Sequence, residues 1–356
     1  MTQGLPRPEA VARELAEFGR RIAMALPALS AASKAQVGCS AKHAIFSHDK
    51  LTLYRFAPIA RPAGLRPVLI CYALVNRPYM MDLQEDRSLV RALLKAGLDV
   101  YLIDWGYPDG ADRLLGLDDY INGHLDRCVQ RILDAHDIDA LNLLGVCQGG
   151  TFSLCYAALH PQRVQNLIVM VAPVDFKTPE NLLSKWVQGI DVDLMTRSGN
   201  VPGALLNLAF LSLMPFRLTQ QKYVALAGAL DNSPELENFM RMEKWIFDSP
   251  DQAATAFGEF IRWFYQENRL IEGTLEIGGR KVDLAKITHP VLNLYALRDH
   301  LVPPSASTAL GSRTGSRHYS PVGIDTGHIG MYVSGTGLRE VPSKIVDWLH
   351  LQAKQE

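Results

Sequence analysis

The sequence predicts an α/β fold: a mostly parallel β-sheet with helices on both faces. Several short runs are apolar at nearly every position, which is typical of parallel strands covered on both sides. These runs lie at 67–73, 100–103, 141–146 and 167–171. Helical patterns at 87–96 and 117–136 alternate with them, as in βαβ units. The composition agrees, because 48% of the residues are hydrophobic and 21% are charged, as in globular proteins.

The first 40 residues are predicted to form a helical segment. Apolar residues recur at helical spacing from Leu15 to Leu26, with charges between them. A signal peptide is the alternative, since two arginines precede a short apolar run, but acidic residues come first and Pro27 interrupts that run. No apolar stretch approaches the ~18 residues that a membrane helix needs, so we expect no membrane span.

The predicted core starts with an antiparallel hairpin. Strand-like runs at 44–47 and 51–56 flank a turn at Asp49 and Lys50. The later strands, at 291–295 and near 317–321, come after a long interruption.

That interruption, residues 174–288, has a helical pattern with irregular links. The pattern predicts a cap inserted before the strand at 291–295, which is followed by a candidate catalytic acid. The core then comprises 41–173 and 289–356. The cap is rich in aromatic residues, which form either its own small core or an apolar cavity or partner surface.

Charge and cysteine content exclude several classes of protein. The 36 basic and 37 acidic residues give a net charge of −1, which leaves no basic excess for binding nucleic acid. The five cysteines lack the paired spacing of metal sites, and their odd number does not suit a disulfide scaffold. A reducing, cytoplasmic setting fits this pattern.

The strongest local signal is the segment 145–150, Gly-Val-Cys-Gln-Gly-Gly, directly after a predicted strand and before a helical stretch at 152–159. It has the form of the G-x-S-x-G nucleophile elbow of the α/β-hydrolase fold, with Cys147 in place of serine. A helix N-terminus behind the thiol would stabilise its anion. The alternative is a buried structural cysteine in a glycine-rich turn.

A nucleophile of this kind needs a base and an orienting acid, which follow it along the chain in this fold. Asp299 lies just past the predicted strand 291–295, where the acid belongs. His328 lies between glycines in a loop, where its imidazole can reach the elbow. Asp325 is a rival acid near His328, but it shares that loop and does not follow the end of a predicted strand.

Two backbone N–H groups would form the oxyanion hole. One is that of Gln148, the residue after the nucleophile, and the other that of Val75, in the loop after an early strand. The alternative is that the loop 74–78 only turns the chain towards Asp82.

A cysteine nucleophile favours acyl transfer over hydrolysis. A thiolate that attacks a thioester gives another thioester at nearly the same free energy, so the acyl group stays activated. If the cap excludes water and the next acceptor is a hydroxyl, the product is an ester.

The chain resembles polyhydroxyalkanoate synthases in six segments, and the similarity covers nearly everything past residue 40. The short length and the segment Glu-Lys-Trp-Ile-Phe-Asp-Ser-Pro resemble the catalytic subunit of the class III enzymes. The chain departs from the family pattern at Thr326. The six segments lie at 73–80, 103–108, 145–150, 243–250, 299–303 and 327–330.

The resemblance implies polymerisation of (R)-3-hydroxybutyryl-CoA to poly(3-hydroxybutyrate) with release of CoA. It implies that Cys147 bears the acyl chain, that His328 is the base, and that Asp299 orients His328 or assists hydroxyl activation. It also implies a homodimer, a non-catalytic second synthase subunit, and a cytoplasmic location at polymer granules. Neither a metal nor a cofactor is implied, since CoA is part of substrate and product.

Two other functions stay open. The same core could serve an acyl-CoA thioesterase or a polyester depolymerase. It could also serve a non-catalytic binding protein, although the complete set of Cys147, Asp299 and His328 argues against that.

Overall fold

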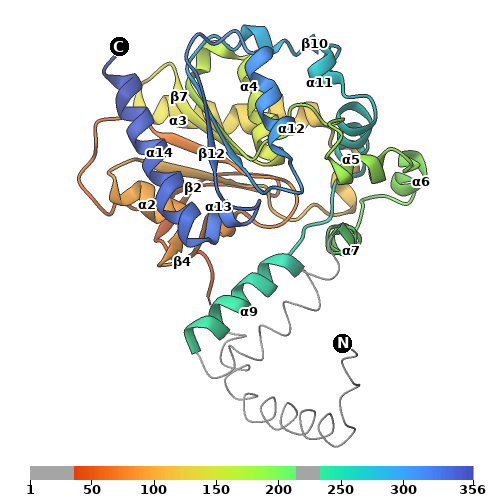
Figure 1. Cartoon of the computed structure of the whole chain (residues 1–356), viewed down its shortest axis with the longest axis horizontal. Helices are drawn as coiled ribbons and strands as arrows, with labels where there is room; N and C mark the ends of the chain where they lie inside the picture. The colour runs from red at the N-terminus through yellow and green to blue at the C-terminus, as the bar shows by residue number, and fades with distance from the viewer. Residues whose placement is uncertain (1–35, 214–232, 356) are drawn as a thin grey trace, which may run out of the picture.

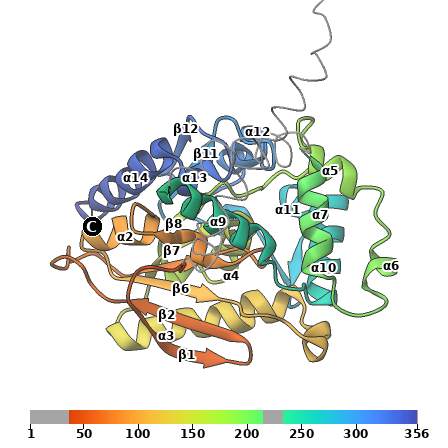
Figure 2. The same ribbon diagram turned by 90° about the horizontal axis from the view of Figure 1, so that it is seen from below.

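The computed structural model describes residues 36–213 and 233–355 (Figure 1). Most of the predicted N-terminal helical segment lies outside these residues, so its prediction is not tested. Figures 1 and 2 show a central sheet with helices packed on both faces.

One eight-stranded sheet organises the fold, in the strand order β1-β2-β6-β3-β7-β8-β11-β12. Its strands are β1 Lys42–His48, β2 Leu51–Phe56, β3 Val68–Cys71, β6 Val100–Asp104, β7 Leu141–Val146, β8 Val164–Met170, β11 Val291–Ala296 and β12 Tyr319–Ile324.

The pairing matches the predicted sheet. β1 and β2 form the antiparallel hairpin, and β2 pairs antiparallel with β6. From β6 to β12 every neighbouring pair is parallel. All six residues of β7 are buried, which explains why its sequence is apolar on both faces. The carboxyl ends of the parallel strands therefore meet at one edge, where active sites of such sheets lie.

Helices cover both faces of this sheet, as predicted. On one face, α3 (Asp126–His136) and α4 (Gln148–Leu159) contribute buried side chains such as Ile132 and Phe152. On the other, α2 (Leu89–Lys95) and α14 (Gly335–Ala353) contribute Leu93 and Ile345 among others. The predicted α/β fold class is confirmed.

Short elements connect these layers. They are η1 Pro78–Met81, β4 Asp82–Gln84, β5 Arg87–Ser88, η2 Gly110–Leu114, η4 Pro161–Arg163, α12 Pro304–Thr308, η8 Ala309–Ser312 and α13 Gly330–Val333.

Two predicted helices differ in detail from the structure. The segment 87–96 begins as β5, because the Ser88 hydroxyl accepts the backbone N–H of Arg91 (2.8 Å) and so caps α2. The segment 117–136 is split into a π-helical turn, η3 (Asp119–Leu125), followed by α3. Apolar spacing alone does not distinguish these helix types.

The described residues between β8 and β11 are mainly helical. They form α5 Leu182–Val187, α6 Val192–Thr196, α7 Gly203–Leu213, α9 Ser233–Phe247, α10 Ala254–Phe260, the π-helix η6 Ile261–Gln266, α11 Arg269–Glu272, a hairpin of β9 Glu276–Ile277 with β10 Arg280–Lys281, and η7 Leu284–Lys286. The predicted cap boundaries at 174 and 288 stay predictions.

The aromatic residues of this region divide into two groups. The rings of Phe176, Phe260 and Phe264 contact one another and join the core of the sheet, where Phe260 also contacts Phe152. In contrast, Trp186 and Phe247 are 51% and 58% exposed. Core packing therefore explains only part of the aromatic content.

Candidate active site

Cys147 lies at the turn between β7 and α4, as the elbow motif predicts. Its backbone has φ 54° and ψ −123°, a strained conformation for a residue with a side chain. α4 begins at the next residue, so its positive N-terminal end faces the half-buried thiol. Strain of this kind is characteristic of a nucleophile held out of its strand and helix.

Glycines make the tight turn possible. A Cβ on Gly145 would lie 2.5 Å from the Ser153 hydroxyl. A Cβ on Gly149 would collide with the backbone carbonyl of Cys71 and lie 2.6 Å from that of Tyr72. The strand β3, the elbow and α4 therefore pack closer than any side chain allows.

We expect Gly149→Ala to lower the free energy of unfolding by about 1–3 kcal/mol, since the added methyl group has no space. Urea unfolding followed by circular dichroism measures this change. Gly110→Ala is the matched control, because nothing lies within 4 Å of its Cβ position. Equal stability of the two variants would show that the elbow is not tightly packed.

Asp299 and His328 meet beside the elbow. The Asp299 carboxylate accepts the backbone N–H groups of Leu301 (2.9 Å) and Val302 (3.0 Å) on Oδ1. Its Oδ2 lies 2.7 Å from Nδ1 of His328. The rival acid Asp325 is exposed and pairs instead with Arg298, 2.9 Å away. The structure thus brings Asp299, and not Asp325, to the imidazole.

The charge of Cys147 also acts on His328. Burial alone would lower the pKa of His328, but the charges of Asp299 and Cys147 and the hydrogen bond with Asp299 raise that pKa to about 10. The imidazole therefore favours its protonated form, which stabilises a thiolate at its side. A cysteine, a histidine and an acid in this order can activate the sulfur and later return the proton.

The predicted oxyanion-hole residues lie on adjoining segments. The side chain of Gln148 accepts the backbone N–H of Leu74 through Oε1 (3.0 Å), so the elbow holds the loop after β3. Val75 is the next residue in that loop, and both Val75 and Cys147 pack against the same buried cluster. This role of the Gln148 side chain could not be predicted from the sequence.

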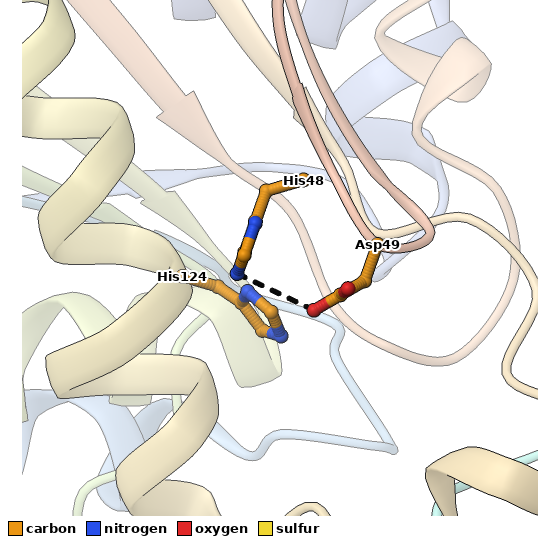
Figure 3. Close-up of side chains that lie close together, drawn as sticks. All are labelled: His48, Asp49 and His124. Carbon is orange, nitrogen blue, oxygen red and sulfur yellow. Dashed lines mark ion pairs between the residues drawn. The ribbon is translucent and has the colours of Figure 1, made fainter.

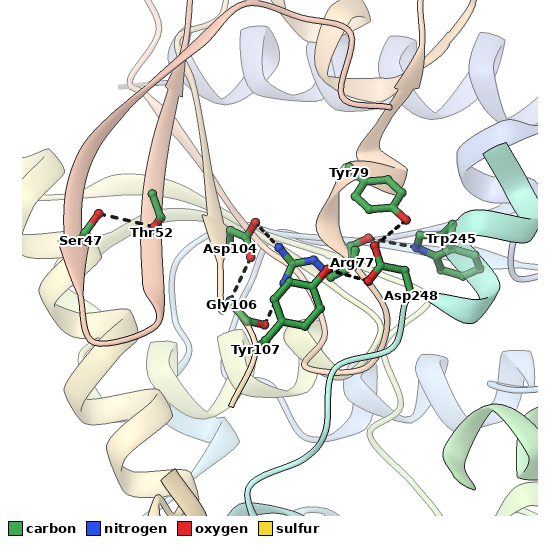
Figure 4. A network of polar contacts seen from close by, with 9 residues as sticks. All are labelled: Ser47, Thr52, Arg77, Tyr79, Asp104, Gly106, Tyr107, Trp245 and Asp248. Atoms are coloured by element: carbon green, nitrogen blue, oxygen red, sulfur yellow. Dashed lines mark hydrogen bonds and ion pairs between the residues drawn. The ribbon is translucent and has the colours of Figure 1, made fainter. Parts of the chain in front are cut away.

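A polar network, shown in Figure 4, connects the loop after β3 to the end of α9 and to the residue that follows it. Asp248 accepts the hydroxyls of Tyr79 (3.0 Å) and Tyr107 (2.6 Å). The indole of Trp245 donates to the carbonyl of Arg77 (3.0 Å), whose guanidinium binds Asp104 (2.7 Å). The loop that carries Val75 is therefore held by a part of the chain about 170 residues away.

We expect Asp248→Asn to lower the free energy of unfolding by about 1–2 kcal/mol, since an amide replaces a carboxylate that accepts two hydroxyls. Turnover should fall several-fold because the loop loses its anchor. Both are measured beside Asp134→Asn, which replaces an exposed aspartate that accepts a hydrogen bond from its helix neighbour Gln130. Unchanged activity of the Asp248 variant would show that the network does not position the loop.

One other cluster has the side-chain types of a metal site. His48, Asp49 and His124 offer ligand atoms within 4.8 Å of one another (Figure 3). The guanidinium of Arg127, however, contacts Nε2 of His48. A second cation at that nitrogen would be repelled, so we assign no metal to this cluster.

A surface cavity of about 610 Å³ lies between η2, α6, α10 and η6. Arg113, Arg197 and Arg262 line it, and none of the three candidate catalytic residues does. It is separate from the site described above.

Among the described residues, none of the helices has both the length and the apolar character to cross a membrane.

Of the other cysteines within the described residues, Cys39 is exposed and three have buried surroundings. Cys71, Cys128 and Cys155 are fully buried, and burial raises the pKa of the Cys71 thiol to about 12. These three thiols pack as small apolar side chains in the core.

Comparison with known proteins identifies the family. Residues 66–334 match the family model of the alpha/beta hydrolase fold. The chain is 55% identical, over 350 residues, to the poly(3-hydroxyalkanoate) polymerase subunit PhaC of Allochromatium vinosum, covering 97% of this chain and 98% of that one. It is 53% identical to the subunit of the same name from Synechocystis, covering 88% and 85%.

A more distant relative is longer. The poly(3-hydroxyalkanoate) polymerase of Methylorubrum extorquens is 27% identical over 301 residues, which cover 82% of this chain but 49% of the relative. The near-complete overlap with the Allochromatium subunit agrees with the predicted resemblance to the short class of synthase.

Solved structures support the fold alone. A monoacylglycerol lipase of Paleococcus ferrophilus superposes with a TM-score of 0.52 at 16% identity, covering 84% of this chain and 99% of the lipase. A membrane phospholipase A gives the same TM-score at 15% identity, covering 96% of each chain. By sequence, this chain belongs to the poly(3-hydroxyalkanoate) polymerase family, and it has the alpha/beta hydrolase fold.

Proposed function

We propose that this chain polymerises (R)-3-hydroxybutyryl-CoA into poly(3-hydroxybutyrate) and releases CoA, with Cys147, His328 and Asp299 as its catalytic triad. One observation carries the proposal. In a member of this family, a buried histidine lies 2.7 Å from a buried aspartate, and the charge of a strained elbow cysteine acts on the same histidine.

In the first step, the Cys147 sulfur attacks the thioester carbonyl of the substrate. The N–H groups of Val75 and Gln148 stabilise the negative oxygen that forms. The carbon–sulfur bond to CoA then breaks, and the imidazolium of His328 gives its proton to the departing thiolate. The acyl group is left as a thioester on Cys147, and CoA leaves as the thiol.

In the second step, neutral His328 takes the proton from the hydroxyl of an incoming 3-hydroxyacyl-CoA. The hydroxyl oxygen attacks the thioester on Cys147, forming an ester bond and releasing the sulfur. The sulfur recovers the proton through His328. The lengthened acyl-CoA then reacts with Cys147 as in the first step, so each cycle adds one unit and frees one CoA.

Asp299 keeps the imidazole oriented in both steps, through the bond between Oδ2 and Nδ1. This bond leaves Nε2 as the nitrogen that exchanges protons with sulfur and hydroxyl. The reaction needs no metal and no cofactor besides the CoA of the substrate.

We also propose a homodimer, a second synthase subunit as partner, and action at the surface of cytoplasmic polymer granules.

The test is incubation of the purified chain with (R)-3-hydroxybutyryl-CoA, with and without a second synthase subunit. Released CoA, polymer and free acid are measured together. We expect one polymer unit for each CoA released. Release of CoA with an equal amount of free acid, and no polymer, would identify a thioesterase instead.

A further inference from the structure

Tyr332 carries a buried hydroxyl for which the described residues provide no hydrogen-bond partner. The residue lies on α13, four positions after His328, and its side chain is 1% exposed. Within the described residues, its Oη atom is buried and makes no hydrogen bond. An unpaired buried hydroxyl destabilises a fold, whereas a phenylalanine would fill the same space without that penalty. Packing therefore does not explain why this position holds a tyrosine.

Other buried tyrosines differ in this respect. The hydroxyl of Tyr101 lies 2.8 Å from Nε2 of His136, and the hydroxyl of Tyr156 donates to Asp126 (2.7 Å). Both side chains are fully buried, like that of Tyr332. Tyr101 and Tyr156 thus have partners for their phenols, whereas the described residues provide none for Tyr332.

The position of Tyr332 connects it to the catalytic groups. Its ring packs edge-on against the His328 imidazole, with ring centroids 6.1 Å apart and planes at 83°. Burial, followed by the charges of Tyr72, Cys147 and Asp299, raises the pKa of Tyr332 well above its usual value. The phenol therefore keeps its proton and is available as a donor beside the triad.

We propose that Tyr332 is a further catalytic residue, whose phenol donates a hydrogen bond to the 3-hydroxyl oxygen of the incoming hydroxyacyl-CoA. This inference rests on the proposed polymerase function. It concerns the elongation step, in which His328 removes the proton of that hydroxyl.

The arrangement favours the 3-hydroxyl over the thioester oxygen as the acceptor. The donors proposed for the thioester oxygen, Val75 and Gln148, belong to the loop after β3 and to the start of α4. Tyr332 instead follows the loop that carries His328. A hydroxyl bound at the imidazole gains negative charge as it loses its proton, and a neighbouring phenol stabilises that charge.

The experiment compares Tyr332→Phe with the unaltered chain on two thioesters. With (R)-3-hydroxybutyryl-CoA, we expect kcat for polymer formation to fall on the order of 10²-fold, the usual effect of losing one such donor. With butyryl-CoA, which has no hydroxyl, acylation of Cys147 should keep its rate. The melting temperature should not fall, because the lost hydroxyl had no partner.

Tyr101→Phe is the matched control, since it removes a buried hydroxyl that has a partner. We expect it to lower the melting temperature and to leave elongation unchanged. If Tyr332→Phe leaves elongation unchanged, or slows acylation by butyryl-CoA as much as elongation, the inference is wrong. If the unaltered chain forms no polymer, the proposed function fails, and the inference falls with it.

Discussion

Replacing Cys147 with alanine is expected to abolish polymer formation and leave the fold intact. Without this sulfur the proposed acyl-enzyme cannot form, so turnover should fall on the order of 10⁴-fold or more. Alanine is smaller than cysteine and meets the same backbone strain, φ 54°, so the melting temperature should change little. CoA release and circular dichroism measure the two effects.

Cys128→Ala is the control for this experiment. Cys128 is fully buried on α3, on the core-facing side of the helix. Its replacement opens a small cavity and should cost about 1 kcal/mol of stability, while most activity persists. An inactive Cys128 variant beside an active Cys147 variant would show that the elbow does not hold the nucleophile.

His328→Gln is expected to have the next largest effect, a fall in turnover of about 10³–10⁴-fold, because the account uses this imidazole in both steps. Glutamine can keep a hydrogen bond to Asp299 but cannot carry the proton. An imidazolium beside a cysteine favours the reactive thiolate form, so alkylation of Cys147 by iodoacetamide at neutral pH should slow as well in this variant.

His318→Gln serves as the matched variant, since His318 is exposed and precedes β12. It should alter neither turnover nor alkylation. If the His328 variant formed polymer at an undiminished rate, another base would have to act on Cys147. If turnover fell while alkylation stayed fast, His328 would serve the hydroxyl step alone.

The parts of the site that local sequence determines were predictable. A strand, a tight turn and a helix around Cys147 follow from apolar residues and glycines that are neighbours in the chain. The strand end before Asp299 and the loop of His328 are equally local features. The three side chains could be expected to lie close together because the parallel sheet brings the carboxyl ends of β7, β11 and β12 to one edge.

Other contacts depend on the tertiary fold and left no local signal. Asp248 reaches Tyr79 and Tyr107 only because the segment after α9 crosses the loop after β3. Tyr332 resembles any apolar core residue in the sequence, and its missing hydrogen-bond partner is visible only in the structure. The short hairpin of β9 and β10 was missed because each strand has two residues, too few for a periodic pattern.

The central claim is that the growing chain is held on Cys147 as a thioester. The most direct test mixes the purified chain with (R)-3-hydroxybutyryl-CoA, stops the reaction with acid within the first turnovers, and maps its peptides by mass spectrometry. The account predicts 3-hydroxybutyryl units on the peptide that contains Cys147, lost on treatment with hydroxylamine and absent from Cys147→Ala. Polymer formation with an unmodified Cys147 peptide, or with the acyl group on another residue, would contradict it.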